Sequence, residues 1–210
     1  MWSWIIVAGT MLLLMNSCGS SQPLPTAQDK PTQAAKQAAG SNSPIQRLRM
    51  QADRGNVEAQ FALAQAYDRG REVPKDKTEA VRWYRLAATQ GDAFAQNALG
   101  DNYWEGRGAP KDDMEAARWW RLAAAQGFAP AQHSLGKLLS GGGQGVATDK
   151  TQAYMWLALS AAQGDEEAGR QGDLLSKQLK PAEIAKAKWL VKQWKPTRAG
   201  VTVNKIGSKR

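Results

Sequence analysis

Apolar residues recur along this chain in a pattern that repeats about every 36 residues. Within the second copy, Ala95, Leu99 and Tyr103 are spaced four residues apart, which places their side chains on one face of a helix. Each copy opens at a glycine, and the intervals between these glycines are 36, 36 and 37 residues: Gly55, Gly91, Gly127 and Gly164. A period of this length is typical of stacked helix pairs. The sequence therefore predicts an all-α fold, an α/α solenoid of antiparallel helix pairs.

Each copy divides into two helices joined by a turn rich in Gly and Pro. The first helix carries Leu-Gly, as in Leu99-Gly100, where the missing side chain lets the second helix approach closely. The second helix opens with an N-cap pattern, Asp followed three residues later by Glu or Gln, at Asp76, Asp112 and Asp149. It ends at a glycine that can adopt the left-handed C-cap conformation. The extra residue of the third copy is expected in the turn at 140–145.

The pattern Ala-x-x-x-Leu-Gly-x-x-Tyr, a Gly-x-Gly turn, Asp-x-x-x-Ala-x-x-Trp and a final Ala-Ala-x-Gln-Gly resembles the Sel1-like repeat family, a tetratricopeptide-like branch of solenoids. The resemblance covers residues 45–196: a half-repeat at 45–54, repeats at 55–90, 91–126 and 127–163, and a degenerate repeat and cap at 164–196. The fourth copy has Gly172-Asp173 where Leu-Gly is expected, which leaves open whether it is a full repeat or a cap. The resemblance implies an adaptor or scaffold role, in bacteria often in the cell envelope.

The N-terminus is typical of an export signal. The apolar stretch from Trp4 to Met15 would span roughly 18 Å as a helix, which is short of the roughly 30 Å bilayer core. Residues 1–17 are therefore interpreted as a signal peptide. The run 15–20 resembles a bacterial lipoprotein signal, which implies lipidation of Cys18 and, with Gly19 next, a periplasm-facing protein of the outer membrane. An ordinary cleaved signal and an uncleaved N-terminus remain the alternatives.

Composition adds a linker and a basic end. Residues 18–44 are rich in Ser, Gln, Pro, Thr and Ala and read as a lipidated, flexible linker. The net charge of +9 comes entirely from residues 177–210, which hold ten Lys or Arg and one acid, Glu183. Within this region, residues 197–210 form a basic C-terminal tail. A basic end of this kind can bind an anionic surface or can simply be a solvated end of the chain.

Catalytic and metal-binding patterns are missing from the sequence. The chain has one Cys and one His, which excludes an internal disulfide framework and a Cys/His metal cluster. The acids at repeat spacing fit helix caps better than general acid–base pairs. His133 has no accompanying nucleophile pattern, so a surface or groove role is preferred for it. The tryptophans at repeat spacing are expected to be mostly core: Trp83, Trp119, Trp120 and Trp156. We expect no catalytic residue, no metal and no cofactor.

Partner binding is expected on the first helix of each pair, which by resemblance lines the concave surface. Positions that do not repeat are free to specify a partner, and they are Phe61, Gln65, Asp68, Asn97, Asp101, Trp104, His133, Lys137 and Ser140. Trp104 has two interpretations, an interface anchor or a side chain packed on a neighbouring turn. The repeating glutamines could bind a peptide backbone, but structural hydrogen bonds between repeats are the favoured interpretation for Gln60, Gln96 and Gln132.

Three functions follow from these patterns. The first is a non-catalytic scaffold of the bacterial envelope that binds a protein or peptide, with a membrane anchor at Cys18. The second is binding to an anionic surface, peptidoglycan, lipopolysaccharide or lipid, through the basic C-terminus. The third, a cell-wall or β-lactam hydrolase, is disfavoured because the chain lacks a nucleophile motif and the paired cysteines of some relatives. Nucleic acid is not an expected partner of an exported chain.

Overall fold

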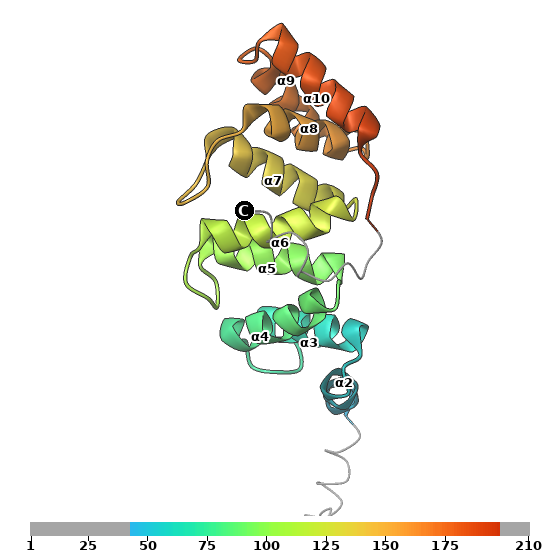
Figure 1. Ribbon diagram of the computed structural model, residues 1–210. Coiled ribbons are helices and arrows are strands. Elements are labelled where there is room, and N and C mark those ends of the chain that lie inside the picture. Colours follow the sequence, from blue (N-terminus) through green and yellow to red (C-terminus); the bar gives the residue numbers. More distant parts are fainter. Residues whose placement is uncertain (1–42, 198–210) are drawn as a thin grey trace, which may run out of the picture. The chain divides into compact units, whose positions relative to one another are not determined.

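The computed structural model describes residues 43–197, and these form helices without a β-sheet in that range (Figure 1). The predicted all-α solenoid of helix pairs is confirmed. The helices are α2 (Pro44–Asp53), α3 (Val57–Arg69), α4 (Lys77–Thr89), α5 (Ala93–Glu105), α6 (Asp113–Ala125), α7 (Ala129–Gly141), α8 (Lys150–Ala161), α9 (Glu166–Ser176) and α10 (Pro181–Gln193). The predicted signal peptide, Cys18, nearly all of the linker, and the basic tail beyond residue 197 lie outside the described residues.

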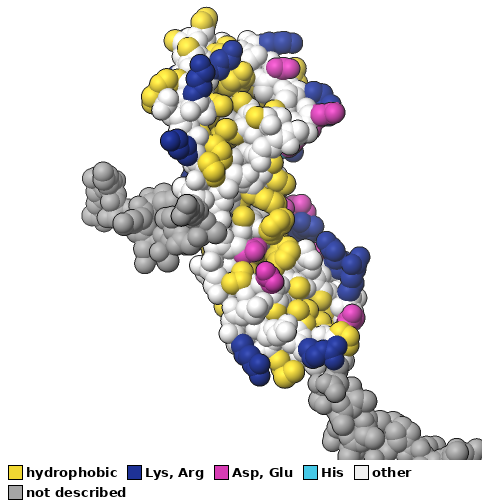
Figure 2. Space-filling model, turned by 90° about the vertical axis from the view of Figure 1, so that its right-hand side faces the viewer, with side chains coloured by type: hydrophobic (Ala, Val, Ile, Leu, Met, Phe, Trp, Pro, Cys, Tyr) yellow, Lys and Arg dark blue, Asp and Glu magenta, His cyan; other side chains and the backbone are white. Residues whose placement is uncertain are grey.

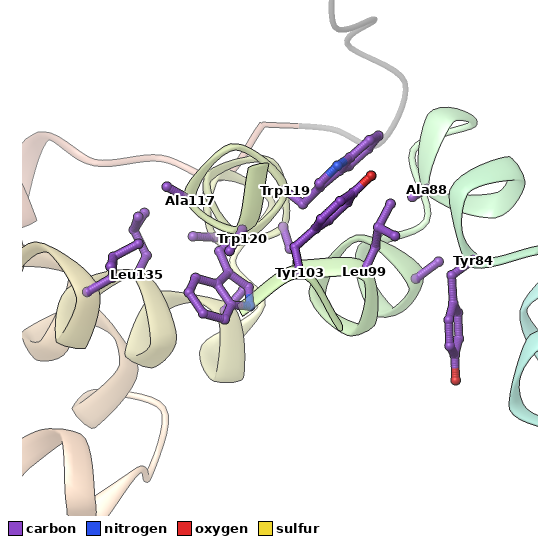
Figure 3. Close-up of a cluster of buried hydrophobic side chains, with 14 of the residues drawn as sticks. Tyr84, Ala88, Leu99, Tyr103, Ala117, Trp119, Trp120 and Leu135 are labelled. Atoms are coloured by element: carbon purple, nitrogen blue, oxygen red, sulfur yellow. The ribbon is translucent and has the colours of Figure 1, made fainter. Parts of the chain in front are cut away.

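Three helix pairs make up the array, α3 with α4, α5 with α6 and α7 with α8, and each pair packs on the next. The half-unit helix α2 packs against α3. A leucine from the first helix of every pair is fully buried in the core: Leu63, Leu99 and Leu135. Figure 3 shows this core where α5, α6 and α7 meet, with Leu99, Trp120 and Leu135 contributed by the three helices. Among residues 43–197, no helix is both long and apolar enough to cross a membrane.

Close helix contacts depend on the predicted glycines. A Cβ added at Gly100 would lie 2.5 Å from Cδ1 of Trp120, and one at Gly136 would lie 2.8 Å from Cγ of Leu157. Both distances are too short for any real side chain, so glycine is required where α5 meets α6 and where α7 meets α8. The predicted left-handed glycine at the end of the second helix is also confirmed, with φ of 98° at Gly91.

At the start of α4 and α6 the aspartates cap the helix as predicted, but the side chains of the glutamates three residues later do not bond the cap. Asp76 Oδ1 accepts hydrogen bonds from the backbone N–H of Thr78 and Glu79, and the equivalent Asp112 does the same in the next pair. The Glu side chains point away from the cap. Glu79 Oε1 instead accepts from Trp83 Nε1 at 2.8 Å and forms an ion pair with Arg82. These glutamates therefore fix the buried indoles rather than complete a capping box.

The third pair breaks this glutamate–tryptophan bond. Gln152 stands where the first two pairs have Glu, and its Nε2 donates to Asp149 Oδ2 at 2.9 Å. The equivalent indole nitrogen, Trp156 Nε1, is buried and has no hydrogen-bond partner among the described residues. One buried donor is thus left unsatisfied, a state that costs about 1–3 kcal/mol.

The last two helices do not form a fourth pair. α10 packs against α8 rather than pairing with α9 (Figure 1). The sequence explains this, because Gly172 replaces the core leucine of α9 and Asp173 replaces the glycine at which a partner helix would approach. Helix α9 thus offers neither the side chain nor the clearance that a partner helix needs. This packing is the one expected if residues 164–196 close the array as a cap.

A short segment after α10 returns to the middle of the array. Thr197 donates from its backbone N–H, at 2.8 Å, and from Oγ1, at 3.1 Å, to the carbonyl of Ala125 at the end of α6. A Cβ placed on Gly127 would lie 3.5 Å from the indole of Trp194, so this turn and the returning segment are in contact. The segment 194–197 therefore holds the cap helix to the second repeat.

Candidate functional site

Buried glutamines join consecutive repeats and belong to the framework rather than to a binding surface. Gln96 Nε2 donates to the Ala88 carbonyl at 3.0 Å, and Gln96 Oε1 accepts from Gln126 Nε2 at 2.8 Å. The same two bonds recur one repeat earlier at Gln60 and one repeat later at Gln132. The favoured interpretation, structural hydrogen bonds between repeats, is confirmed, because both functional groups of each side chain are already engaged.

A polar cluster lies at the middle of the array, where three of the predicted groove residues come together with one that was not predicted. Asp101 Oδ1 accepts from Trp120 Nε1 at 2.9 Å, and Asp101 Oδ2 accepts from Asn97 Nδ2 at 3.0 Å. Trp104 packs on Trp120 with ring centroids 5.9 Å apart. We call Asn97, Asp101, Trp104 and Trp120 the central cluster. Repetition assigned Trp120 to the core, and it is buried, yet its indole N–H also positions the carboxylate of Asp101.

The central cluster contains a carboxylate without an ion-pair partner and an amide oxygen without a hydrogen-bond donor among the described residues. Burial raises the pKa of the Asp101 carboxyl to about 6, although the hydrogen bond from Trp120 and the positive charge of Arg107 act in the opposite direction. Among the described residues no ion pair reaches this carboxylate. The Oδ1 atom of Asn97 is buried and likewise has no partner there. The cluster therefore lacks a hydrogen-bond donor at Asn97 Oδ1 and a positive charge at Asp101.

Trp104 is held in place by the chain itself. Besides the contact with Trp120, its ring lies under the ammonium group of Lys111, with Nζ 4.7 Å from the ring centroid. Lys111 belongs to the turn between α5 and α6. Trp104 therefore packs on a neighbouring turn, as one of its two interpretations predicted. The side chain remains partly exposed, and a cation over an indole face contributes about 0.5–1 kcal/mol at such a site.

The three candidate residues of the first repeat have different surroundings. Phe61 packs against Tyr84 and Phe94, with centroids 5.8 and 5.9 Å away. Asp68 accepts from Lys77 Nζ at 2.6 Å, which ties α3 to α4. Gln65 lines a hollow of about 360 Å³ between α2 and α3, together with Ile45, Leu48, Ala62, Arg69 and Arg71. Of the three, Gln65 is the one placed at a described hollow.

The candidates of the third repeat face the cap. His133 Nδ1 lies 2.8 Å from Asp165 Oδ2 and Nε2 lies 3.3 Å from Gln171 Oε1, so the imidazole links α7 to α9. Lys137 and Ser140 line a second hollow, of about 250 Å³, with Leu157, Gln171, Leu174 and Gln178. The two hollows thus lie at opposite ends of the array, on either side of the central cluster.

Ser160, Asp165 and His133 share residue types with hydrolase sites, but their geometry is that of a helix cap. Ser160 Oγ lies 2.9 Å from the Ala129 carbonyl oxygen and 2.9 Å from Asp165 Oδ2, the oxygen that faces His133, so these two acceptors share its single proton. Asp165 also accepts from the Ala168 N–H at the start of α9. Burial alone would raise the pKa of Asp165. These hydrogen bonds and the nearby His133 act more strongly in the opposite direction, so the pKa lies below its ordinary value. A serine bonded to the aspartate, and itself buried, is not placed to be activated by an imidazole. In residues 43–197, no group of three or more His, Cys, Asp or Glu could hold a metal ion.

A row of phenylalanines was not anticipated from the repeat pattern. Phe94 contacts Phe61 of the preceding repeat and Phe128 of the following one, the latter at a centroid distance of 4.8 Å. Phe94 is 57% exposed. The three residues occupy different positions of their repeats, so alignment by period separates them. Figure 2 shows hydrophobic side chains gathered along the middle of one face of the array.

Comparisons with known proteins agree with this architecture. The sequence profile described as "Sel1 repeat" matches residues 57–92, 93–128 and 129–165. A solved structure of a Sel1 repeat protein from Oxalobacter formigenes is 40% identical, with a TM-score of 0.57, and the match covers 61% of this chain and 96% of that one. A second solved structure is that of c5321, a protective antigen present in uropathogenic Escherichia coli strains that displays an SLR fold. It is 29% identical to this chain, with a TM-score of 0.54. That match covers 76% of this chain and 42% of the antigen. No curated protein sequence matches the chain.

Proposed function

This chain belongs to the Sel1 repeat family, and we propose that it is a non-catalytic scaffold of the bacterial cell envelope that binds a protein or peptide across α3, α5 and α7. Sel1 repeat proteins are generally scaffolds for protein–protein interaction and generally lack catalysis. The envelope location, the binding face and the partner are our proposals.

The main support for this binding site is that the central cluster contains a carboxylate without an ion-pair partner and a buried amide oxygen without a donor among the described residues. Repeats 1 and 3 place Gln65 and Lys137 at the position of Asp101, while the surrounding leucine, small residue and buried glutamine stay nearly constant. The constant residues complete their own contacts. By contrast, Asn97 Oδ1 has no donor among the described residues, and the Asp101 carboxylate, although each of its oxygens accepts one hydrogen bond, has no ion-pair partner there. Buried polar groups are normally hydrogen-bonded, and those that are not point to a missing partner.

The chemistry of the cluster selects the kind of partner. A basic side chain would supply the positive charge that the Asp101 carboxylate lacks, and an N–H group would supply the donor that Asn97 Oδ1 lacks. Trp104, fixed between Trp120 and Lys111, offers a rigid aromatic edge beside them. Aromatic residues held in place in this way lose little conformational entropy when they bind. The expected ligand is a segment with a Lys or Arg flanked by apolar residues.

Site-specific photocrosslinking tests the binding face. A photoreactive amino acid replaces Gln65 or Lys137 on the proposed face, and Arg82 or Arg118 on the outer helices serves as the matched control, since both arginines are about half exposed. We expect one crosslinked species from the proposed face, lost when Asp101→Ala is added, and none from the controls. Equal crosslinking from both faces, or a species unaffected by Asp101→Ala, would reject the assignment.

Envelope attachment is a separate part of the proposal and depends on Cys18. Two or more acyl chains hold a protein stably at a membrane. Metabolic labelling with a clickable fatty acid should therefore mark the full chain and fail to mark Cys18→Ser, which should also move to the soluble fraction. Labelling that persists in Cys18→Ser would exclude lipidation at this residue without affecting the proposal for the central cluster.

A further inference from the structure

The cap helix α10 leaves one of its faces uncovered. Its inward side is anchored by Ala187, which is fully buried, and by the partly buried Leu190, Val191 and Trp194. The opposite side presents Trp189, which is 59% exposed although tryptophan is a large apolar residue. Helical spacing of three, four and seven residues places exposed neighbours around this indole: Ala182, Ala185, Lys186, Lys192 and Gln193. We call these residues together with Trp189 the α10 outer face.

The surroundings of this face are strongly basic. Between residues 177 and 197 there are six lysines, all exposed, and one acid: Lys177, Lys180, Lys186, Lys188, Lys192, Lys195 and Glu183. None of these lysines takes part in an ion pair within residues 43–197, and Glu183 is occupied in accepting from the Lys180 N–H at 2.8 Å. On neighbouring α9, Glu166 and Glu167 both pair with Arg170. At the end of the array that contains α10, Figure 2 shows Lys and Arg side chains interspersed with hydrophobic ones.

An exposed indole among free lysines fits a lipid headgroup layer better than water. Tryptophan has an apolar body and a polar N–H, so its rings favour the boundary between headgroups and acyl chains. Lysine side chains can extend from such a helix to reach lipid phosphates. The two small alanines beside Trp189 leave the indole free to enter the layer. A helix with these features lies in the plane of the membrane rather than across it.

We propose that the α10 outer face docks on the surface of a bilayer that contains anionic phospholipid, with Trp189 entering the headgroup layer and Lys186 and Lys192 contacting phosphates. This surface is distinct from the central cluster, so the two can be occupied together. Cap docking would orient the array on the membrane, which an anchor joined through a linker does not do.

Vesicle cosedimentation tests the proposal with the full chain carrying Cys18→Ser, so that acylation cannot contribute. Neutral phosphatidylcholine vesicles measure whatever the rest of the chain contributes, and vesicles with about one-third phosphatidylglycerol measure the charge-dependent part. Each lysine near an anionic surface contributes roughly fivefold in affinity. We therefore expect Lys186→Glu with Lys192→Glu to lower binding to the anionic vesicles at least tenfold, and Trp189→Ala to lower it severalfold. Raising the salt from about 0.1 to about 1 M should abolish the difference between the two kinds of vesicle.

Three controls make the test decisive. Arg54→Glu with Lys75→Glu makes the same charge change at exposed sites away from α10 and should retain binding. Met50→Ala removes another exposed apolar side chain, 48% accessible, and should also be silent. Circular dichroism of each variant shows whether the helices persist. The proposal is overturned if neutralising the four basic residues of 198–210 abolishes anionic binding while the α10 variants retain it. It is equally overturned if the protein binds isolated peptidoglycan but not anionic vesicles.

Discussion

Replacing Asp101 with asparagine should stabilise the protein at neutral pH and leave its stability almost unchanged near pH 4. The carboxylate sits in the central cluster with neutral donors, Trp120 Nε1 and Asn97 Nδ2, and among the described residues no ion pair compensates its charge. Asparagine has nearly the same shape, and its Oδ1 can still accept from Trp120. The substitution therefore removes the buried charge and keeps the main hydrogen bond.

The magnitude follows from the pKa of Asp101. Burial raises it to about 6, whereas an unfolded chain has an aspartate pKa near 3.9. Since the folded state holds the proton more tightly, this group contributes stability that is fully present below about pH 4 and is lost as the pH rises through about 6. A difference of about two pKa units corresponds to just under 3 kcal/mol. The carboxylate is partly exposed, so solvent screening reduces the expected gain to about 1–2 kcal/mol.

Urea unfolding followed by circular dichroism, at several pH values from about 4 to about 7.5, measures this difference. We expect Asp101→Asn to match the wild type near pH 4 and to exceed it by about 1–2 kcal/mol at about pH 7.5. Asp68→Asn is the matched control, because Asp68 bonds to Lys77 Nζ at 2.6 Å and its loss should slightly destabilise the protein at neutral pH. The reasoning fails if Asp101→Asn is the less stable protein at about pH 7.5, or if its advantage does not change with pH.

Four further substitutions test the framework by the same unfolding measurement. Gln152→Glu should gain about 1 kcal/mol, because a glutamate can accept from the unpartnered Trp156 Nε1 as in the first two pairs; no gain would mean that the indole is already satisfied. Gly100→Ala should lose about 1–3 kcal/mol from its clash with an indole, whereas Gly169→Ala, whose Cβ meets another at an ordinary 3.7 Å, should gain about 0.5–1 kcal/mol. Gln96→Ala should cost about 1–3 kcal/mol, because the Ala88 carbonyl loses its side-chain donor and Gln126 loses its acceptor, and a neutral result would refute the structural role of the buried glutamines.

Features set by the repeat period were predictable from the sequence. Leu99, Gly100 and Gln96 recur at fixed spacing because every helix pair meets the next in the same way, so their burial and their roles could be inferred from periodicity alone. The Asp caps could be inferred for the same reason, since one residue type at the start of every second helix has a local explanation.

Contacts that break the period could not be predicted. The bond from Thr197 to Ala125 joins residues 72 apart in sequence, and no local pattern announces it. The packing of α10 on α8 could be suspected from Gly172-Asp173, but its direction depends on three-dimensional clearance. Glu79 fits a capping box by spacing, yet it bonds Trp83. The Asp76 N–H that a capping box would engage already donates to the Tyr67 carbonyl, whereas the buried indole N–H needs an acceptor. Sequence spacing therefore locates such a residue without identifying its partner.

Asp101 in the central cluster departs from the residues at the same position of the neighbouring repeats, and its charge lowers stability at neutral pH. These two features together support a binding role for the cluster. At the position of Asp101 the neighbouring repeats use Gln65 and Lys137, so the fold does not require a carboxylate there. A buried, incompletely compensated charge that stability does not favour persists where another function needs it, and such trade-offs are common at binding sites. A partner that brings a cation to Asp101 would lower its pKa and remove the cost of its burial. The affinity of that partner should then fall as the pH drops through about 6, with Asp101→Asn binding weakly and without this pH dependence. A partner that binds wild type and Asp101→Asn equally at every pH would place the recognition site elsewhere on the array.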